Sequence, residues 1–355
     1  MTTTVRLVFC AFLTTLPLIG GILKAADSAP IMDSIIFSGR WDLRSHDHAI
    51  TVNSGSYFRA RFSGPSIGAK FDLSLNKTPL PTITWRIDDG DWQESEIAPE
   101  VKLADGLPNA THTVWLMVRG IDEHQNRWTS PLVGSITFLG LGLSEGGKIL
   151  SPLEPWIKPQ LKIEFLGDSI TEGVLVQAGG CGPGKTSWPW QTDALDSYAC
   201  QTAMLLNADW RQVGFGATGL DHGGSGGAKP ALESFNYFYQ DCPRDNWQPD
   251  LVVINQGTND ASMPPEKYGP LYTKYLALIR QAYPKAKIAA LRPFGGFQAA
   301  SINQDVNEAR AQGDSALYYI DSTGWYSGTV HPNAASSIGL AQKLAAALKS
   351  EVLSP

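Results

Sequence analysis

The 355-residue sequence is poor in cysteine, histidine and clustered basic residues. It has four cysteines and six histidines, with no CxxC pair and no close His/Cys group of the kind that is typical of metal sites. Its formal net charge is −6, and no dense run of Lys or Arg occurs. This balance argues against nucleic acid or an anionic membrane surface as a partner. Charged residues make up only 17% against 43% hydrophobic residues, which is typical of a globular chain with a sizeable core.

Long apolar runs are also absent after the first 23 residues, so we expect no later segment to cross a bilayer. Residues 1–29 have the pattern of a secretory signal peptide, with Arg6 at a positive start, an apolar stretch at 7–23 and small residues at 24–29. The alternative is a retained membrane anchor. We expect removal of the signal, which would leave a secreted or periplasmic protein with no membrane partner.

The cysteines give little further guidance. Cys10 falls in the expected signal, which leaves Cys181, Cys200 and Cys242 in the mature chain. An oxidising compartment permits one disulfide and one free thiol among these three, but their spacing does not select the pair.

The pattern of the remaining chain divides it in two, as its length suggests. From 30 to 145, short strands alternate with turn signals and no helical period occurs, which predicts a β-sandwich of jelly-roll type. Residues 146–160 are the expected linker, in a stretch rich in Gly and Pro. From 161 to 355, apolar strands alternate with helices, which predicts an α/β domain, a parallel sheet sandwiched by helices. The strands expected there are 161–166, 210–213, 251–255, 287–291 and 316–320, and the helices 196–207, 232–240, 267–282, 302–311 and 333–349.

Two motifs in the second domain fit known patterns but lack the expected surroundings. Residues 179–186 fit the P-loop pattern GxxxxGK[ST], yet Trp188-Pro189-Trp190 is an awkward helix start, and the strand at 251–255 ends in Asn rather than Asp. Residues 223–227 fit the nucleophile elbow G-x-S-x-G, but no strand precedes them. We interpret both as chance matches.

A third, dispersed set of residues fits the predicted fold better. Gly167-Asp168-Ser169 follows the first strand, Gly214-Phe215-Gly216 the second, and the run 255–260, which contains Gly257-Thr258-Asn259-Asp260, the third. His331-Pro332-Asn333 opens the last helix. Because ligands bind at the carboxyl edge of open α/β sheets, these segments are expected to meet in one crevice.

These blocks resemble the GDSL or SGNH hydrolase superfamily, in which Ser, Gly, Asn and His follow in this chain order, and the resemblance covers about 161–348. The β-sandwich ahead of them, with Phe37-Ser38-Gly39-Arg40-Trp41 near its start, is more narrowly similar to carbohydrate esterase family 2. The resemblance implies a serine esterase that removes acetyl groups from polysaccharides such as xylan, without a metal or an organic cofactor. Its partner would be an acetylated carbohydrate.

The chemistry assigns a role to each block. Ser169 is the expected nucleophile, because a hydroxyl attacks an ester well only beside a base. His331 is the expected base, and His222, in a glycine-rich loop, is the weaker alternative. The backbone N–H groups of Ser169 and Gly216 and the side chain of Asn259 would form the oxyanion hole.

The sequence departs from the superfamily at the residue that orients the histidine. In most members an Asp stands three residues before the His, whereas Gly328 occupies that position here. A backbone carbonyl could orient His331 in a Ser-His dyad, and Asp321, at the end of the last expected strand, is an alternative orienter. Trp188 and Trp190 are expected either to wall the substrate site or to pack their loop down.

Two other functions compete with an acetylesterase. One is a lipid or thioester hydrolase on the same scaffold, although no long hydrophobic lid is evident. The other is a non-catalytic carbohydrate-binding protein with a decayed site. The four intact motif residues Ser169, Gly216, Asn259 and His331 argue against decay.

Overall fold

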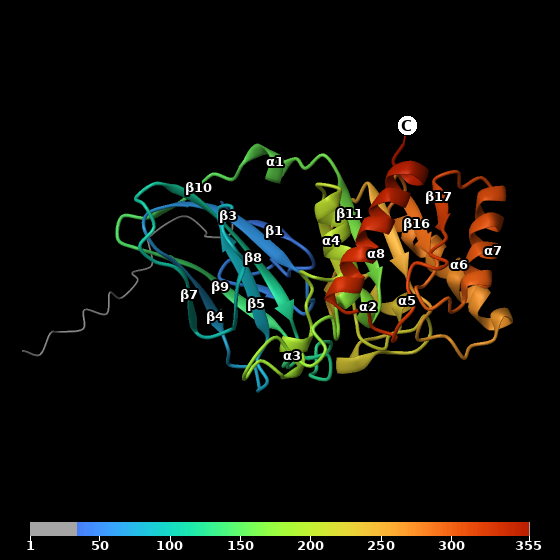
Figure 1. The fold of residues 1–355 in the computed structure, drawn as a ribbon, viewed down its shortest axis with the longest axis horizontal. Coiled ribbons are helices and arrows are strands. Elements are labelled where there is room, and N and C mark those ends of the chain that lie inside the picture. The colour runs from blue at the N-terminus through green and yellow to red at the C-terminus, as the bar shows by residue number, and fades with distance from the viewer. Residues whose placement is uncertain (1–33, 355) are drawn as a thin grey trace, which may run out of the picture.

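The first half of the chain is a β-sandwich of two antiparallel sheets (Figure 1), as the sequence predicts. The computed structural model describes residues 34–354, so the expected signal peptide at 1–29 lies outside the described residues. One sheet has the order β1-β3-β8-β5-β6 with β10 beside β3, and the other has the order β2-β9-β4-β7. The strands are β1 (Ile36–Ser38), β2 (Ala49–Thr51), β3 (Tyr57–Ser63), β4 (Ile67–Asp72), β5 (Thr82–Ile87), β6 (Gln93–Glu96), β7 (Glu100–Ala104), β8 (Thr111–Gly120), β9 (Ile136–Leu143) and β10 (Lys148–Leu150).

The sandwich core follows the two-residue period of its strands. Phe58, Ala60 and Phe62 of β3 are fully buried between the sheets, and they meet Phe138 of β9 in the same hydrophobic cluster. The pairing of β10 with β3 places the first residues of the expected linker, 146–160, within the sandwich. The segment that crosses to the second half then contains the short helix α1 (Glu154–Ile157).

The second half contains a five-stranded parallel sheet in the order β12-β11-β15-β16-β17, also as predicted. Its strands are buried on both faces, as is usual for parallel sheets. In β15, Leu251 and Val253 face one hydrophobic cluster, while Val252 and Ile254 face the other. The strands are β11 (Lys162–Gly167), β12 (Asp209–Gly214), β15 (Leu251–Asn255), β16 (Lys287–Leu291) and β17 (Leu317–Ile320).

Helices cover both faces of this sheet (Figure 1). The cluster that includes α4 (Tyr198–Leu205) and α8 (Ala334–Ala347) lies on one face, and the cluster that includes α5 (Ala231–Ser234), α6 (Pro265–Ala282) and α7 (Ala299–Ala311) lies on the other. A π-helical turn, Leu348–Val352, extends α8. The short helices α2 (Ser169–Glu172) and α3 (Trp188–Gln191) lie between β11 and α4. None of the helices within residues 34–354 is both long and apolar enough to span a bilayer.

The helix expected at 232–240 is wrong in part. Only Ala231–Ser234 is helical, and β13 (Tyr237–Tyr239) pairs with β14 (Cys242–Pro243) as a small hairpin. The aromatic run Tyr-Phe-Tyr has a strong preference for strand, which outweighs the helical spacing of the flanking residues.

Three buried arginines of the sandwich join the two halves. Arg40, Arg119 and Arg127 are at most 2% exposed. Each faces an acid of the α/β domain: Arg40 lies 3.5 Å from Glu164, Arg119 lies 2.9 Å from Asp193, and Arg127 pairs with Glu172. Removing one partner of such a pair leaves a buried charge uncompensated, so these contacts hold the two domains in one arrangement.

The cysteines of residues 34–354 are all free thiols. Cys181 is exposed, whereas Cys200 and Cys242 are buried in separate surroundings. The disulfide that the sequence permits is therefore not formed.

Candidate active site

The order of the parallel strands creates a switch point at the end of β11. The chain passes from β11 to β12 on one side and then returns to β15 on the other. Ligand sites of open α/β sheets lie at such a point, outside the carboxyl ends of the strands. The predicted Ser, Gly and Asn blocks follow β11, β12 and β15, so this topology brings them to one edge.

Ser169 is the first residue of α2, immediately after the strand. Asp168 caps this helix by accepting a hydrogen bond from the Ile170 N–H at 3.0 Å. A Cβ at Gly167 would lie 2.2 Å from Thr171 Oγ1, so only glycine allows the helix to turn back so closely. Burial raises the pKa of the Asp168 carboxyl to about 7.

His331 contacts Ser169 directly. The distance from His331 Nε2 to Ser169 Oγ is 2.9 Å. The loop that carries the histidine is anchored by the Ala334 N–H, which donates to Val176 O at 3.0 Å. Burial lowers the pKa of His331, which favours the neutral imidazole that a general base requires.

Within residues 34–354, no carboxylate lies in ion-pair distance of His331. Asp321 is exposed and accepts hydrogen bonds from the Thr323 N–H at 2.9 Å and the Thr323 hydroxyl at 2.6 Å. Its nearest cation is Arg292, whose Nε lies 3.8 Å away. The prediction that Asp321 orients His331 by direct contact is therefore wrong, because the Asp321 carboxylate accepts hydrogen bonds from Thr323 in the turn after β17.

Two hydroxyls instead hold the backbone of the histidine. Tyr326 Oη donates to His331 O at 3.3 Å, and Thr329 Oγ1 donates to the same oxygen at 3.0 Å. A Cβ at Gly328 would lie 2.6 Å from Tyr326 Oη. An aspartate at position 328 would displace this tyrosine, which gives a steric reason for the glycine there.

The Gly216 N–H is engaged elsewhere, so its assignment to the oxyanion hole needs correction. It donates to Glu172 Oε2 at 3.1 Å. The carboxylate of Glu123 covers the same glycine, because a Cβ there would lie 1.4 Å from Glu123 Oε2. The next residue, Ala217, is exposed and has φ +58, and its N–H has no partner among the described residues. Ala217 therefore offers the free donor of this turn.

Asn259 lies beside the turn that carries Ser169. Its Nδ2 is 3.2 Å from Asp168 Oδ2 and 3.2 Å from Thr218 O. The amide thus bridges the block that follows β15 to the blocks that follow β11 and β12. The Ser169 N–H, at the first position of α2, has no backbone or side-chain partner within residues 34–354.

The remaining candidates lie around this centre. His222 Nε2 is 3.2 Å from Asn259 O and does not contact Ser169. Trp190 is 4% exposed and donates from Nε1 to Glu96 at 3.1 Å, so it packs the loop onto the sandwich and does not wall an open site. Trp188 is partly buried, with its ring centroid 4.7 Å from that of His124.

The two chance motifs lack the structures that their functions need. No strand leads into residues 179–186, and Lys185 pairs with Glu94 of the sandwich at 2.8 Å. Residues 223–227 lie in a loop whose 3-10 turn, Ser225–Gly227, is not preceded by a strand. No group of three or more His, Cys, Asp or Glu within residues 34–354 is arranged to hold a metal ion.

Sequence reasoning missed Glu123, Arg127 and Glu172. Burial, followed by repulsion from Glu172, raises the pKa of Glu123 to about 7. These three charged residues cluster around the Gly216 turn from two different domains. Only the pairing of the domains brings them together, so no local pattern in the sequence points to them.

The fold, with Ser169 and His331 in contact at the switch point, is that of a GDSL-type hydrolase. The GDSL-like lipase/acylhydrolase family model matches residues 165–336, and the carbohydrate esterase 2 N-terminal model matches residues 37–152. The chain therefore combines a GDSL-like lipase/acylhydrolase domain with the N-terminal domain of carbohydrate esterase 2.

Curated relatives carry related names. The cellulase/esterase CelE of Acetivibrio thermocellus is 26% identical over 347 residues, which is 90% of this chain and 39% of that protein. An acetylxylan esterase/glucomannan deacetylase of Cellvibrio japonicus is 28% identical over 211 residues, which is 54% of this chain and 58% of that protein. The chain thus spans less than two thirds of the length of either relative.

Solved structures agree on the fold. A family two carbohydrate esterase from Clostridium thermocellum, in complex with cellohexaose, matches with a TM-score of 0.73 and 26% identity, over 89% of this chain and 98% of that one. A family two esterase from Cellvibrio japonicus also matches with a TM-score of 0.73, at 23% identity, over 91% of this chain and 96% of that one.

Proposed function

We propose that this chain is a secreted or periplasmic serine esterase that removes O-acetyl groups from carbohydrate, such as acetylated xylan or a related polysaccharide. The 2.9 Å contact between Ser169 Oγ and His331 Nε2 at the switch point carries the proposal. The substrate class is supported by the relatives' names, acetylxylan esterase and glucomannan deacetylase. The location rests on the signal pattern of residues 1–29.

The reaction proceeds through an acyl-enzyme. Ser169 Oγ attacks the acetyl carbonyl while its proton passes to His331 Nε2, and the carbonyl electrons move onto the oxygen. The oxyanion collapses, the sugar hydroxyl leaves with the proton from His331, and the acetyl group stays on Ser169. Water then attacks the acyl-enzyme while His331 takes its proton. The bond between the acetyl carbon and Ser169 Oγ breaks, His331 returns the proton to Ser169, and acetate is released.

Three donors are proposed to stabilise the oxyanion: the N–H groups of Ser169 and Ala217 and the Asn259 side chain, which would exchange its 3.2 Å contact with Asp168 Oδ2 for the oxyanion. Ala217 replaces Gly216 in this role because Glu172 already accepts the Gly216 N–H. Such a donor is worth about 3–4 kcal/mol in related acyl-transfer sites. Without an acid beside the imidazole, Tyr326 and Thr329 position His331 through its carbonyl oxygen.

Acetate release from acetylated xylan by the wild type, Ser169→Ala and Ser315→Ala tests the proposal. Ser315 is an exposed serine in the loop before β17, so its variant controls for loss of a hydroxyl. We expect the wild type and Ser315→Ala to release acetate at equal rates and Ser169→Ala to release none above background. Acetate release by Ser169→Ala, or its absence from the wild type, would overturn the proposal.

A series of aryl esters separates the acetylesterase from the lipid or thioester hydrolase. An acetylesterase hydrolyses the acetate fastest, whereas preference for an octanoate would favour the lipid hydrolase. A wild type that is inert on all of them yet binds polysaccharide would support a non-catalytic binding protein.

A further inference from the structure

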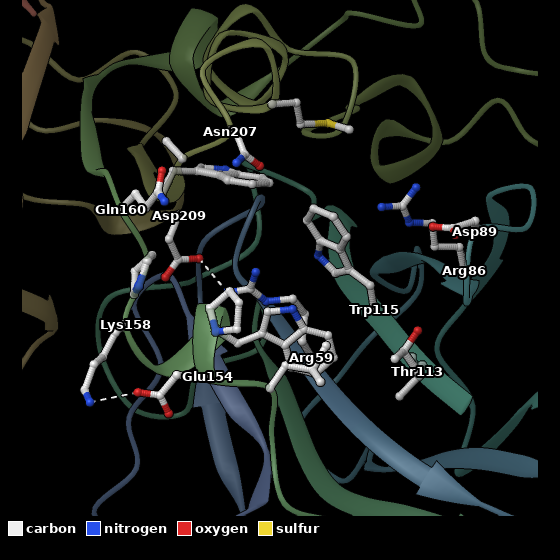
Figure 2. A pocket seen from close by; sticks show the side chains of 18 of the residues that line it. Arg59, Arg86, Asp89, Thr113, Trp115, Glu154, Lys158, Gln160, Asn207 and Asp209 are labelled. Carbon is white, nitrogen blue, oxygen red and sulfur yellow. Dashed lines mark hydrogen bonds and ion pairs between the residues drawn. The ribbon is translucent and has the colours of Figure 1, made fainter. Parts of the chain in front are cut away.

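A cavity of about 1000 Å³ opens between the sandwich and the α/β domain (Figure 2), and Ser169 is not among the residues that line it. Asp209 and Trp210, at the amino end of β12, line it. Ser169 follows the carboxyl end of β11, which pairs with β12 in parallel so that Lys162 faces Asp209. The two sites are therefore separated by the length of a strand, roughly 17 Å for five residue steps.

Three tryptophans line this cavity: Trp115, Trp156 and Trp210. The centroids of the Trp115 and Trp210 rings are 5.8 Å apart. Trp156 comes from α1, between the domains, and lies 5.4 Å from the guanidinium of Arg59. Trp210 is buried behind the wall, whereas the partly exposed rings of Trp115 and Trp156 offer flat apolar faces to the C–H faces of a sugar.

Two of these indoles have an unused hydrogen-bond donor. Trp210 is 1% exposed, and the buried Nε1 atoms of both Trp115 and Trp210 lack a partner among the described residues. A buried donor without an acceptor is costly in a folded protein and is commonly satisfied by an ordered water. Because both Nε1 atoms are shielded from the open cavity, they do not select its ligand. Figure 2 shows Trp115 standing between Arg59, Asn207 and Arg86 at the cavity wall.

The charges that line the cavity largely cancel one another. Arg59 pairs with Asp209 at 2.8 Å, and Lys158 pairs with Glu154 at 2.8 Å. Three cations face four acids in all, so the cavity does not select a strongly charged ligand. The charged lining residues are Arg59, Arg86, Lys158, Asp88, Asp89, Glu154 and Asp209.

The uncharged polar side chains suit hydroxyl groups. Asn207 and Gln160 are exposed and line the same cavity (Figure 2). Each amide both donates and accepts hydrogen bonds, so it can bind a hydroxyl in either role. Aromatic walls, neutralised charges and free amides together fit a neutral ligand with many hydroxyls.

We propose that this cavity is a second saccharide-binding site, which holds an unacetylated, neutral segment of a polysaccharide chain while Ser169 acts elsewhere. The carbohydrate class of the ligand rests on the proposed function. No covalent step occurs at this site, and it contributes affinity for the polymer only. Small aryl acetates, which are too short to reach both sites, gain nothing from it.

Trp156→Ala tests the site with Trp247→Ala as its matched control. Both tryptophans are partly buried and stack on an arginine, since Trp247 lies 4.3 Å from Arg211, but Trp247 does not line the cavity. Asn207→Gly is a second variant, because its φ of +50 suits glycine. Xylohexaose and cellohexaose, both unacetylated, are titrated calorimetrically into each protein, and aryl acetate hydrolysis is measured beside them.

We expect Trp156→Ala and Asn207→Gly to weaken the binding of at least one hexasaccharide by at least about fivefold. Trp247→Ala should bind the hexasaccharides with wild-type affinity, and the aryl acetate kcat/KM of all variants should equal that of the wild type. The bound sugar should not inhibit aryl acetate hydrolysis. Unchanged hexasaccharide affinity in both cavity variants, or no hexasaccharide binding by the wild type, would overturn the proposal of a second site. A protein that releases no acetate but loses binding in Trp156→Ala would overturn the proposed function and keep the site.

Discussion

Arg127 of the sandwich and Glu172 of the α/β domain form a buried ion pair that reaches the Gly216 turn. Arg127 Nη2 lies 3.1 Å from Glu172 Oε2, and neither side chain is exposed. The same Oε2 accepts the Gly216 N–H at 3.1 Å, and Glu172 lies in α2, the helix that begins with Ser169. The sandwich therefore positions the turn beside Ser169, the proposed nucleophile, and is part of the framework of the candidate site.

Arg127→Met should damage both stability and activity. The change leaves Glu172 buried without its cation, which costs about 3–5 kcal/mol in comparable pairs. Urea unfolding followed by fluorescence measures the loss, and aryl acetate hydrolysis under folding conditions measures the activity. Lys102→Ala is the control, because Lys102 and Asp105 form an exposed pair at 3.0 Å and should contribute less than about 1 kcal/mol. Equal effects of the two changes would contradict a positioning role for Arg127.

The positioning of His331 predicts opposite results for two neighbouring residues. Tyr326→Phe removes a hydroxyl that donates to His331 O, so kcat/KM should fall about fivefold, the worth of one ordinary hydrogen bond. Asp321→Asn should change it by no more than about twofold, as a surface substitution does. A large loss of kcat/KM in Asp321→Asn, with no loss in Tyr326→Phe, would show that Asp321 orients His331.

The sequence predicted the architecture well because each domain has a strong local pattern. The strands around Leu251 and Lys287 are short apolar runs between turn signals, and their alternation with helices requires a parallel sheet. The Ser169–His331 contact followed from the same reasoning, since both residues fall at one edge of that sheet.

The finer features of the site depend on contacts between distant segments. The Gly216 N–H is occupied because Arg127 holds the carboxylate of Glu172 against this turn. The positive φ of Ala217 could not be predicted, because the residue is not a glycine. Asp321 precedes the histidine by ten residues, yet the local turn to Thr323 uses its carboxylate. Such competition between a local and a distant partner cannot be read from spacing alone.

The rate should depend on pH through His331. Burial lowers its pKa from the usual 6.5, so the imidazole remains neutral to a lower pH than in a free peptide. The kcat/KM for an aryl acetate should therefore rise with pH along a single acid limb, with its midpoint below 6.5. His222→Ala should keep this limb, because His222 does not contact Ser169. A midpoint above the usual value would point to a charged partner for His331.

Asn259→Ala should slow acyl transfer without unfolding the protein. If the Asn259 amide stabilises the oxyanion, its loss lowers kcat by about 10²–10³-fold and leaves KM nearly unchanged. Asn303→Ala, at an exposed asparagine of α7, provides the comparison and should keep full activity. Loss of stability in Asn259→Ala with a proportionate loss of activity would instead assign the residue to the bridge between Asp168 and Thr218.

Glu123 should make the protein less stable as the pH rises. Burial, then repulsion from Glu172, raises its pKa from 4.5 to about 7, so between these values the unfolded chain releases a proton that the folded protein keeps. Stability therefore falls with pH across this window, and the loss is complete above it. Glu123→Gln should match the wild type near pH 4 and exceed it at pH 8 by on the order of 2 kcal/mol.

Thermal or urea unfolding at both pH values checks this expectation, with Glu100→Gln, at an exposed glutamate of β7, as the control. The control should show no change with pH relative to the wild type. If Glu123→Gln is instead less stable at pH 8, the ionised carboxylate is held by Arg127 strongly enough to outweigh its burial. Its place over Gly216 would then be a stabilising contact of the turn.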